Sequence, residues 1–284
     1  MLKDRPSLTA QRVALSRAAH QLYDHPRILE DPVAVAIIGP RGQAEIRHHR
    51  RRFELAPARH LRAFLVARSR VAEEALAAAV ARGVRQYVVL GAGLDTFALR
   101  NPYPDPLLRV FEVDHPATQA WKRRRLAAAG IEPPGSLTFV PIYFETQTLA
   151  AVLREAGLQH EQPAFFSWLG VTMYLTAATV LATLKYVAAS TPAGSAIVFD
   201  YAVPPAGLGL ARRLAARALL VRVAAAGEPW KAFFAAGELV AALRGLGFAD
   251  IEDFGPDELN ARFFRDRQDG LRIAGLGRVL CALR

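Results

Sequence analysis

The feature of this sequence that most constrains its fold is a short apolar run that opens directly into a glycine turn. Residues 86–90 (QYVVL) have the β-branched and aromatic composition of a buried strand, and Gly91-Ala-Gly-Leu-Asp-Thr96 follows at once. A helical pattern over residues 59–82 precedes the strand and ends at Gly83, a residue type common at helix ends. This order of elements predicts βαβ units and a parallel sheet.

The rest of the chain repeats the alternation of helical patterns and short apolar runs. We expect further strands at residues 108–114, 137–140, 164–169, 195–200, 248–254 and 277–282. We expect helices between them at residues 117–129, 149–156, 177–189, 207–222 and 235–246. Residues 1–58 look mostly helical, which predicts a cap or lid ahead of the main α/β domain at residues 59–284.

Composition limits the class of protein. With 284 residues, 52% of them hydrophobic, the chain can bury a large core, and its single cysteine, Cys281, excludes an internal disulfide. It contains no uninterrupted apolar run of about 18 residues, and its N-terminal residues lack the apolar core of a signal peptide. We therefore expect a cytoplasmic protein with no membrane partner.

The net charge of +10 raises the question of nucleic-acid binding. The basic residues are scattered from Arg5 to Arg284, and the two local clusters, at residues 48–52 and 122–125, fit solvated helix faces without aromatic interleaving. We therefore expect no nucleic-acid partner. The seven histidines lack the spacing of metal ligands, so we also expect no metal site.

The glycine turn lies where an open α/β sheet binds ligands, at the carboxyl ends of its strands. Gly91 and Gly93 allow a ligand to approach the backbone closely, and Glu112 and Asp114 follow about 20 residues later, where an acidic side chain accepts hydrogen bonds from ribose. Two other interpretations stay open at this point. The glycines fit a simple tight turn, and Asp114 fits a helix N-cap.

The identity of the ribose-bearing ligand is narrowed by Thr96. It occupies the position of the third glycine in the Gly-x-Gly-x-x-Gly pattern, which seats a pyrophosphate on a helix N-terminus. The turn therefore fits an adenosyl ligand without phosphates better than a dinucleotide.

Arg68 lies on the apolar face of the helix before the glycine turn. A guanidinium in that position needs an anionic partner, because an unpaired buried charge is costly. The carboxylate of an amino-acid-bearing cofactor fits this need. An internal salt bridge to Glu73, Glu74 or another acid fits it as well.

The chain resembles the leucine carboxyl methyltransferase-like family of S-adenosylmethionine-dependent methyltransferases, as a bacterial member. The resemblance runs from about residue 8 to the end of the chain. It rests on Leu29-Glu-Asp-Pro32, Ala67-Arg-Ser-Arg70, Tyr87-Val-Val-Leu-Gly-Ala-Gly-Leu-Asp-Thr96, Val110-Phe-Glu-Val-Asp-His-Pro116, Phe139-Val-Pro-Ile-Tyr-Phe-Glu-Thr146 and Phe165-Phe-Ser-Trp-Leu-Gly-Val-Thr-Met-Tyr-Leu-Thr176.

The resemblance implies a Rossmann-like class I fold, with a mostly parallel seven-stranded sheet, helices on both faces and an N-terminal helical cap. It implies S-adenosyl-L-methionine as cofactor. By similarity, Arg68 would hold the carboxylate of the cofactor, Gly91 and Gly93 would approach its methionyl part, and Asp114, with Glu112 nearby, would bind its ribose.

The sequence departs from the family pattern at two places. Tyr143 and Phe144 stand where an acidic residue and a hydrophobic one are expected beside the adenine, and Leu169 stands where many relatives carry a glutamate near the methionyl amino group. All three remain in the expected cofactor site. The acceptor pocket is expected to be lined by three residues of the fourth-strand motif, Trp168, Met173 and Tyr174. Each of them also fits a core position at the end of the strand.

The resemblance implies methyl transfer to a carboxylate or hydroxyl oxygen of a small-molecule acceptor, including a secondary metabolite. Methyl transfer from a sulfonium is an in-line displacement that depends on alignment of the reactants, and only a hydroxyl acceptor benefits from a general base. Arg12 and Arg17 in the cap are placed to attract an anionic acceptor, although surface solvation explains them equally well. The candidates for a general base, each with a structural role as the alternative, are His20, Tyr23, His25 and Tyr201.

Two other functions fit parts of the sequence. A non-catalytic binding module with a degenerate methyltransferase fold would account for Tyr143 and Leu169. An NAD(P)-dependent oxidoreductase would share the sheet, but Thr96 and the lack of a Tyr-x-x-x-Lys pair disfavour it.

Overall fold

Seven strands form one sheet in the order β3-β2-β1-β4-β5-β7-β6. The computed structural model describes residues 8–143, 146–207, 209–225 and 229–284. Neighbouring strands among the first five pair in parallel, and β7 runs antiparallel to both β5 and β6. The strands are β1 (Gln86–Leu90), β2 (Arg109–Asp114), β3 (Leu137–Pro141), β4 (Ala164–Trp168), β5 (Ala196–Ala202), β6 (Asp250–Phe254) and β7 (Gly277–Leu283). The predicted mostly parallel seven-stranded α/β sheet is confirmed.

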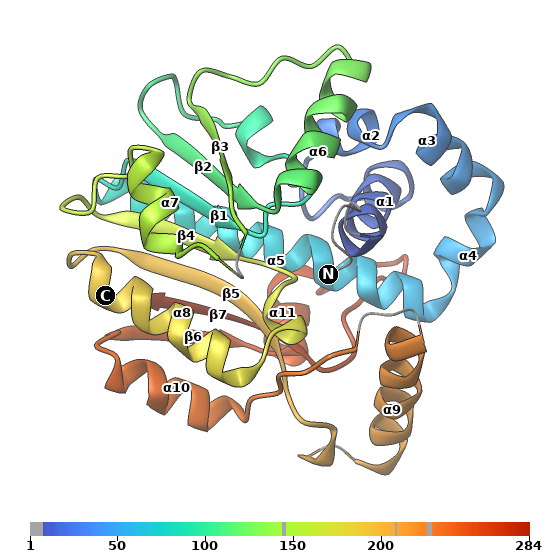
Figure 1. The fold of residues 1–284 in the computed structure, drawn as a ribbon. Helices are drawn as coiled ribbons and strands as arrows, with labels where there is room; N and C mark the ends of the chain where they lie inside the picture. The colour runs from blue at the N-terminus through green and yellow to red at the C-terminus, as the bar shows by residue number, and fades with distance from the viewer. Residues whose placement is uncertain (1–7, 144–145, 208, 226–228) are drawn as a thin grey trace.

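Helices cover both faces of the sheet and extend beyond it at one side (Figure 1). The α-helices are α1 (Leu8–Tyr23), α2 (Pro32–Ile37), α3 (Gly39–His48), α4 (Arg50–Glu54), α5 (Ala56–Ala81), α6 (Pro116–Ala128), α7 (Leu149–Glu155), α8 (Ala177–Ser190), α9 (Leu210–Ala225), α10 (Ala236–Gly245) and α11 (Pro256–Phe263). Short 3-10 turns lie at η1 (Phe97–Leu99), η2 (Thr172–Tyr174) and η3 (Pro205–Gly207).

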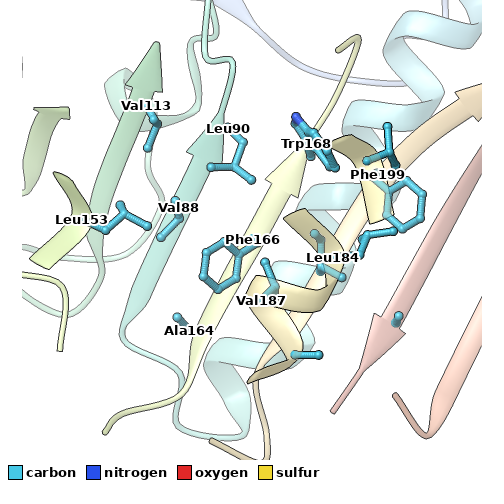
Figure 2. Close-up of a cluster of buried hydrophobic side chains, with 14 of the residues drawn as sticks. Val88, Leu90, Val113, Leu153, Ala164, Phe166, Trp168, Leu184, Val187 and Phe199 are labelled. Atoms are coloured by element: carbon cyan, nitrogen blue, oxygen red, sulfur yellow. The ribbon is translucent and has the colours of Figure 1, made fainter. Parts of the chain in front are cut away.

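The central strand β1 shows how the sheet divides the core in two. Because side chains alternate along a strand, Val88 and Leu90 face the side covered by α7, α8 and α10, and Figure 2 shows them within that cluster. Tyr87 and Val89 face the opposite side, where they pack with α5. Burial on both faces explains why the strand has a continuous apolar sequence rather than an alternating one.

The N-terminal helices form a cap beside the carboxyl ends of β1 and β2. A third apolar cluster joins Ala18 of α1 and Ile46 of α3 to Leu94 of the glycine turn and Leu126 of α6. The cap therefore packs directly on the segment that the sequence predicts to bind the cofactor. The predicted boundary at residue 58 falls in the first turn of α5, which begins at Ala56.

The elements differ from the sequence-based expectations mainly at their ends. The helix expected at residues 207–222 spans Leu210–Ala225, and α11 was not expected at all. Its eight residues, PDELNARF, include few apolar side chains, and Leu259 alone is buried, so the sequence offers little pattern from which to predict a helix. It begins at Pro256 and is stabilised at its start by Glu258, which accepts a hydrogen bond from the Gly255 amide.

Asp24 links the cap to α5 through a buried charged cluster. Its carboxylate accepts hydrogen bonds from Nδ1 of His20 at 2.8 Å and from Nε and Nη2 of Arg62 at 2.7 and 2.9 Å. Burial alone would raise the pKa of Asp24, but hydrogen bonds from His20 and Arg62 and the charge of Arg62 lower it to about 2. All three side chains are at most 1% exposed, and Arg62 also donates to the Phe53 carbonyl oxygen and lies 3.6 Å from Glu54.

We expect Asp24→Asn to lower the free energy of unfolding by about 3 kcal/mol, because it leaves the buried Arg62 with only the more distant Glu54 as a counter-ion. The pKa of Asp24 is lower in the folded state than its ordinary value of 3.8, so its contribution is present above that pH and is lost as the pH falls through about 2. Urea unfolding as a function of pH should therefore show a smaller loss of stability over this range for the variant than for the wild type.

The matched control is Glu30→Gln, which removes the exposed cap ion pair with Arg27. It should leave the stability almost unchanged. Equal effects of the two substitutions would contradict the assigned role of Asp24.

Candidate functional site

The order of the sheet reverses between β1 and β4, and the loops that leave these two strands border the expected ligand position. Gly91 and Gly93 follow β1 with φ angles of +68° and +52°, in the left-handed region that favours glycine. A Cβ atom on Gly91 would lie 2.4 Å from Cγ2 of Val171, in the loop after β4. A Cβ atom on Gly93 would lie 3.1 Å from Cβ of Ala10 in α1. The turn is therefore held closely between the cap and the loop after β4.

Asp114 ends β2 directly beside this turn. Its Oδ2 accepts a hydrogen bond from the Gly93 amide at 2.6 Å, and its Oδ1 accepts one from the His115 amide at 2.6 Å. Burial raises the pKa of Asp114, and these two hydrogen bonds act against the rise. The N-cap of α6 is His115, whose Nδ1 accepts from the Ala117 amide, so Asp114 is not the helix cap.

The geometry leaves Asp114 able to bind further donors. Each carboxylate oxygen offers about two acceptor positions, and one on each is used by the backbone. A ribose diol donates two hydrogen bonds, and the remaining acceptor positions of Asp114 are sufficient in number to receive both.

Glu112 lies two residues earlier on the same strand and has a different role. Its Oε2 accepts a hydrogen bond from Nζ of Lys122 at 2.5 Å, and both side chains are 1% exposed. Lys122 also donates to the carbonyl oxygen of Asp95 at 2.5 Å. The structure thus places Glu112 in a buried ion pair beneath the glycine turn, and we do not propose it as a cofactor ligand.

Arg68 of α5 finds a partner that the sequence-based analysis missed. Its Nη1 donates to Oδ2 of Asp200 on β5 at 2.6 Å, and Asp200 is fully buried. Oδ1 of Asp200 accepts from the Gly170 amide at 2.5 Å, and its carbonyl oxygen accepts from the Thr172 hydroxyl at 2.5 Å. The internal salt bridge considered for Arg68 is therefore present, with Asp200 rather than Glu73 or Glu74.

The ion pair does not use all of the donors of Arg68. Its Nε is buried and has no hydrogen-bond partner among the described residues. A Cβ atom on Gly170 would lie 2.9 Å from Nη2, so the guanidinium lies directly against the loop after β4. An orphaned cationic donor at this position fits a carboxylate of a bound ligand.

The segment after β3 supplies an aromatic pair. The ring of Tyr143 is 49% exposed and meets the His115 ring edge to face, with the ring centroids 5.2 Å apart. His115 follows Asp114 directly, so the pair lies next to the carboxylate expected to bind ribose. Phe144, the other residue expected beside the adenine, lies outside the described residues.

The residues expected near the acceptor differ in their surroundings. Trp168 is 4% exposed and packs in the core cluster shown in Figure 2. Leu169 is half-buried and packs with the cluster on the α5 side of the sheet. Met173 and the partly buried Tyr174 lie in η2, and the Met173 carbonyl accepts from the Lys231 amide at 2.7 Å. Of this group, Trp168 ends β4 and Leu169 follows it directly, whereas Met173 and Tyr174 lie in the η2 turn of the loop after β4.

The candidate general bases occupy structural positions. His20 is fully buried, and its Nδ1 bonds to Asp24 while its Nε2 accepts from the Ile28 amide. Tyr23 donates to the carbonyl oxygen of Ile46. Burial and the neighbouring Asp253, to which its hydroxyl donates, raise the pKa of Tyr201. We therefore do not propose these three as bases, and His25 remains as an exposed residue after α1.

Arg17 of α1 links the cap to the glycine turn through hydrogen bonds and ion pairs. Its Nη2 donates to Oδ2 of Asp31 at 2.6 Å and to the Thr96 hydroxyl at 2.9 Å, and its Nη1 donates to Oδ2 of Asp95 at 3.1 Å. Arg100 approaches Asp31 from the opposite side at 3.4 Å. Arg17 is 5% exposed, so its charge is committed to this network and is not displayed to an incoming acceptor.

Within the described residues, no group of His, Cys, Asp and Glu side chains is arranged to hold a metal ion. No helix in the same part of the chain is long and apolar enough to cross a membrane. Around the reversal point, the residues that could hold an organic cofactor are Arg68, Gly91, Gly93 and Asp114.

Comparison with known proteins gives relatives along most of the chain. A family model described as leucine carboxyl methyltransferase matches residues 10–188. The chain is 33% identical over 291 residues to "Putative S-adenosyl-L-methionine-dependent methyltransferase YktD" of Bacillus subtilis (strain 168), with 95% of each chain covered. It is 35% identical over 179 residues to a protein of the same description from Mycobacterium sp. (strain JLS), covering 60% of this chain and 66% of the relative.

A solved structure supports the fold. Human N-acetylserotonin methyltransferase in complex with SAM superposes with a TM-score of 0.50 and 13% identity, covering 98% of this chain and 68% of the other. At that identity the likeness shows the fold alone. The family model, which spans more than half of the chain, and the relative matched along 95% of its length show that this chain belongs to the leucine carboxyl methyltransferase family.

Proposed function

We propose that this chain, an S-adenosylmethionine-dependent methyltransferase by family, transfers the methyl group to an oxygen of a small-molecule acceptor. The observation that carries the proposal is the placement of Asp114 and Arg68 on opposite sides of the reversal point, with the glycine turn between them. Asp114 would bind the ribose, the turn at Gly91 and Gly93 would lie beside the cofactor, and the free donor of Arg68 would bind the carboxylate.

The contribution of the protein to methyl transfer is alignment and exclusion of water. The bound cofactor supplies an electrophilic methyl group on its sulfonium sulfur. Arg68 and Asp114 would fix the two ends of the cofactor, and the cap would cover the glycine turn through Arg17 and its partners. The acceptor oxygen then needs only to lie in line with the methyl carbon and the sulfur.

Among oxygen acceptors we favour a carboxylate. A carboxylate is ionised at neutral pH and needs no general base, whereas an alcohol or phenol benefits from one. Three of the four candidate bases, His20, Tyr23 and Tyr201, already hold structural hydrogen bonds. A cytoplasmic metabolic acid, including a secondary metabolite, fits this requirement.

Calorimetric titration with S-adenosylhomocysteine tests the cofactor site. We expect Asp114→Ala to weaken binding about 10- to 100-fold, because two hydrogen bonds from the ribose to a charged acceptor are lost. Asp257→Ala, which removes an exposed carboxylate from the first turn of α11, serves as the control and should bind like the wild type. Undiminished binding by a folded Asp114→Ala variant would contradict the assignment of the ribose site.

Arg68 and Asp200 can be separated by measuring stability and binding together. Asp200→Asn leaves Arg68 without its buried counter-ion, so we expect a loss of about 3 kcal/mol in the free energy of unfolding. We expect Arg68→Met to weaken S-adenosylhomocysteine binding by about tenfold or more, because it removes the donor for the cofactor carboxylate. If Asp200→Asn weakens binding as much as Arg68→Met while both proteins remain folded, Arg68 acts only through the ion pair.

The acceptor class can be tested with radiolabelled methyl transfer from S-adenosylmethionine to a panel of carboxylic acids and the corresponding alcohols. Products of a carboxyl methyltransferase are esters, which release labelled methanol in base, whereas methyl ethers are stable. We expect base-labile product. Base-stable product formed only with the alcohols would overturn the preference for a carboxylate acceptor.

A further inference from the structure

Helix α9 (Leu210–Ala225) follows η3, between β5 and α10 in the chain, and stands apart from the helices that cover the sheet (Figure 1). Its contact with the body of the protein involves Ala216, which is buried in a small cluster with Ala202 at the end of β5 and Leu276 before β7. The side of the helix that carries Ala216 therefore faces the protein. The opposite side has no apolar cluster against it within the described residues.

The outward side of α9 carries large apolar side chains. Leu214 is 57% exposed and Val221 is 68% exposed. Seven residues correspond to about two turns of an α-helix, so these side chains point in nearly the same direction, and the exposed Ala218 lies between them. Ala216, two residues after Leu214, lies about half a turn around the helix, in agreement with its burial. The outward side of the helix thus carries exposed apolar side chains.

Positive charge borders this stripe. The helix sequence LARRLAARALLVRVAA contains four arginines and no acidic residue. Arg217 is exposed and lies within about one turn of both Leu214 and Val221. In the part of the chain that the structure describes, no acidic side chain forms an ion pair with Arg217. The outward face of α9 therefore combines exposed apolar side chains with the positive charge of Arg217, which has no acidic partner among the described residues.

We propose that the outward face of α9, formed by Leu214, Arg217, Ala218 and Val221, docks on an anionic lipid surface. A helix face that presents leucine, valine and arginine can lie in the plane of a bilayer, with leucine and valine among the acyl chains and arginine at the headgroups. The attraction of arginine to anionic headgroups adds to the burial of apolar area. The interaction is peripheral and involves a single helix face. It differs from the expectation of no membrane partner, which rested on the lack of a spanning segment.

The same observations disfavour two other occupants of this face. A second copy docked face to face would bring together two surfaces that both carry positive charge, which is unfavourable. A nucleic acid would be bound by arginines alone and would leave Leu214 and Val221 exposed, because the stripe has no aromatic side chain for stacking on bases.

Co-sedimentation with lipid vesicles tests the proposal with the full chain. We expect the wild type to pellet with vesicles of phosphatidylcholine containing about one-third phosphatidylglycerol, and much less with phosphatidylcholine alone. The Leu214→Gln/Val221→Gln variant should bind about tenfold or more weakly, because it removes the apolar insertion. Arg217→Gln should weaken binding about fivefold, and raised salt should reduce the binding of the wild type.

The matched control is Leu107→Gln/Leu181→Gln, which removes two exposed leucines from other parts of the surface. It should pellet like the wild type. Failure of the wild type to bind anionic vesicles, or equal binding by the α9 double variant with unchanged thermal stability, would overturn the proposal. So would a dimer in solution that the α9 double variant dissociates, or salt-sensitive binding to duplex DNA without any binding to vesicles.

Discussion

The ion pair between Arg68 and Asp200 connects three parts of the fold that come from distant parts of the sequence. Arg68 belongs to α5, Asp200 to β5, and the Gly170 amide that completes the arrangement belongs to the loop after β4. An isolated charge at either position would be costly, since Asp200 is fully buried and Arg68 is 6% exposed. Together they fix the loop that borders the reversal point of the sheet. The expected cofactor position depends on this loop being in place.

A second layer of charged contacts surrounds the glycine turn. Lys122 bridges Glu112 and the Asp95 carbonyl below the turn, and Arg17 bridges Asp31 and Asp95 on the side of the cap. Such networks are stabilising only when all members are paired, because removal of one partner leaves a buried charge. The turn is therefore positioned by electrostatics as well as by the left-handed backbone of its glycines. A rigid turn suits a reaction that depends mainly on alignment of the reactants.

Much of the fold could be predicted from the sequence because the strands are buried on both faces. The predicted strand at residues 86–90 matches β1, and every other predicted strand has its counterpart. The position of Asp114 beside Gly93 could also be predicted, since a separation of about 20 residues between the glycine turn and an acidic residue is typical of ribose binding. The partner of Arg68 could not be predicted from the sequence. Asp200 ends an apolar run 132 residues later, and only the tertiary fold brings the two together.

The buried contacts of Arg17 also bear on whether the first helix can move. Cβ of Ala10 in α1 lies 3.1 Å from the position of a Cβ on Gly93, so the first helix closes over the turn against which the cofactor is proposed to lie. Because Arg17 of the same helix is held by Asp31 and Asp95, any movement of α1 away from the turn would break these buried contacts.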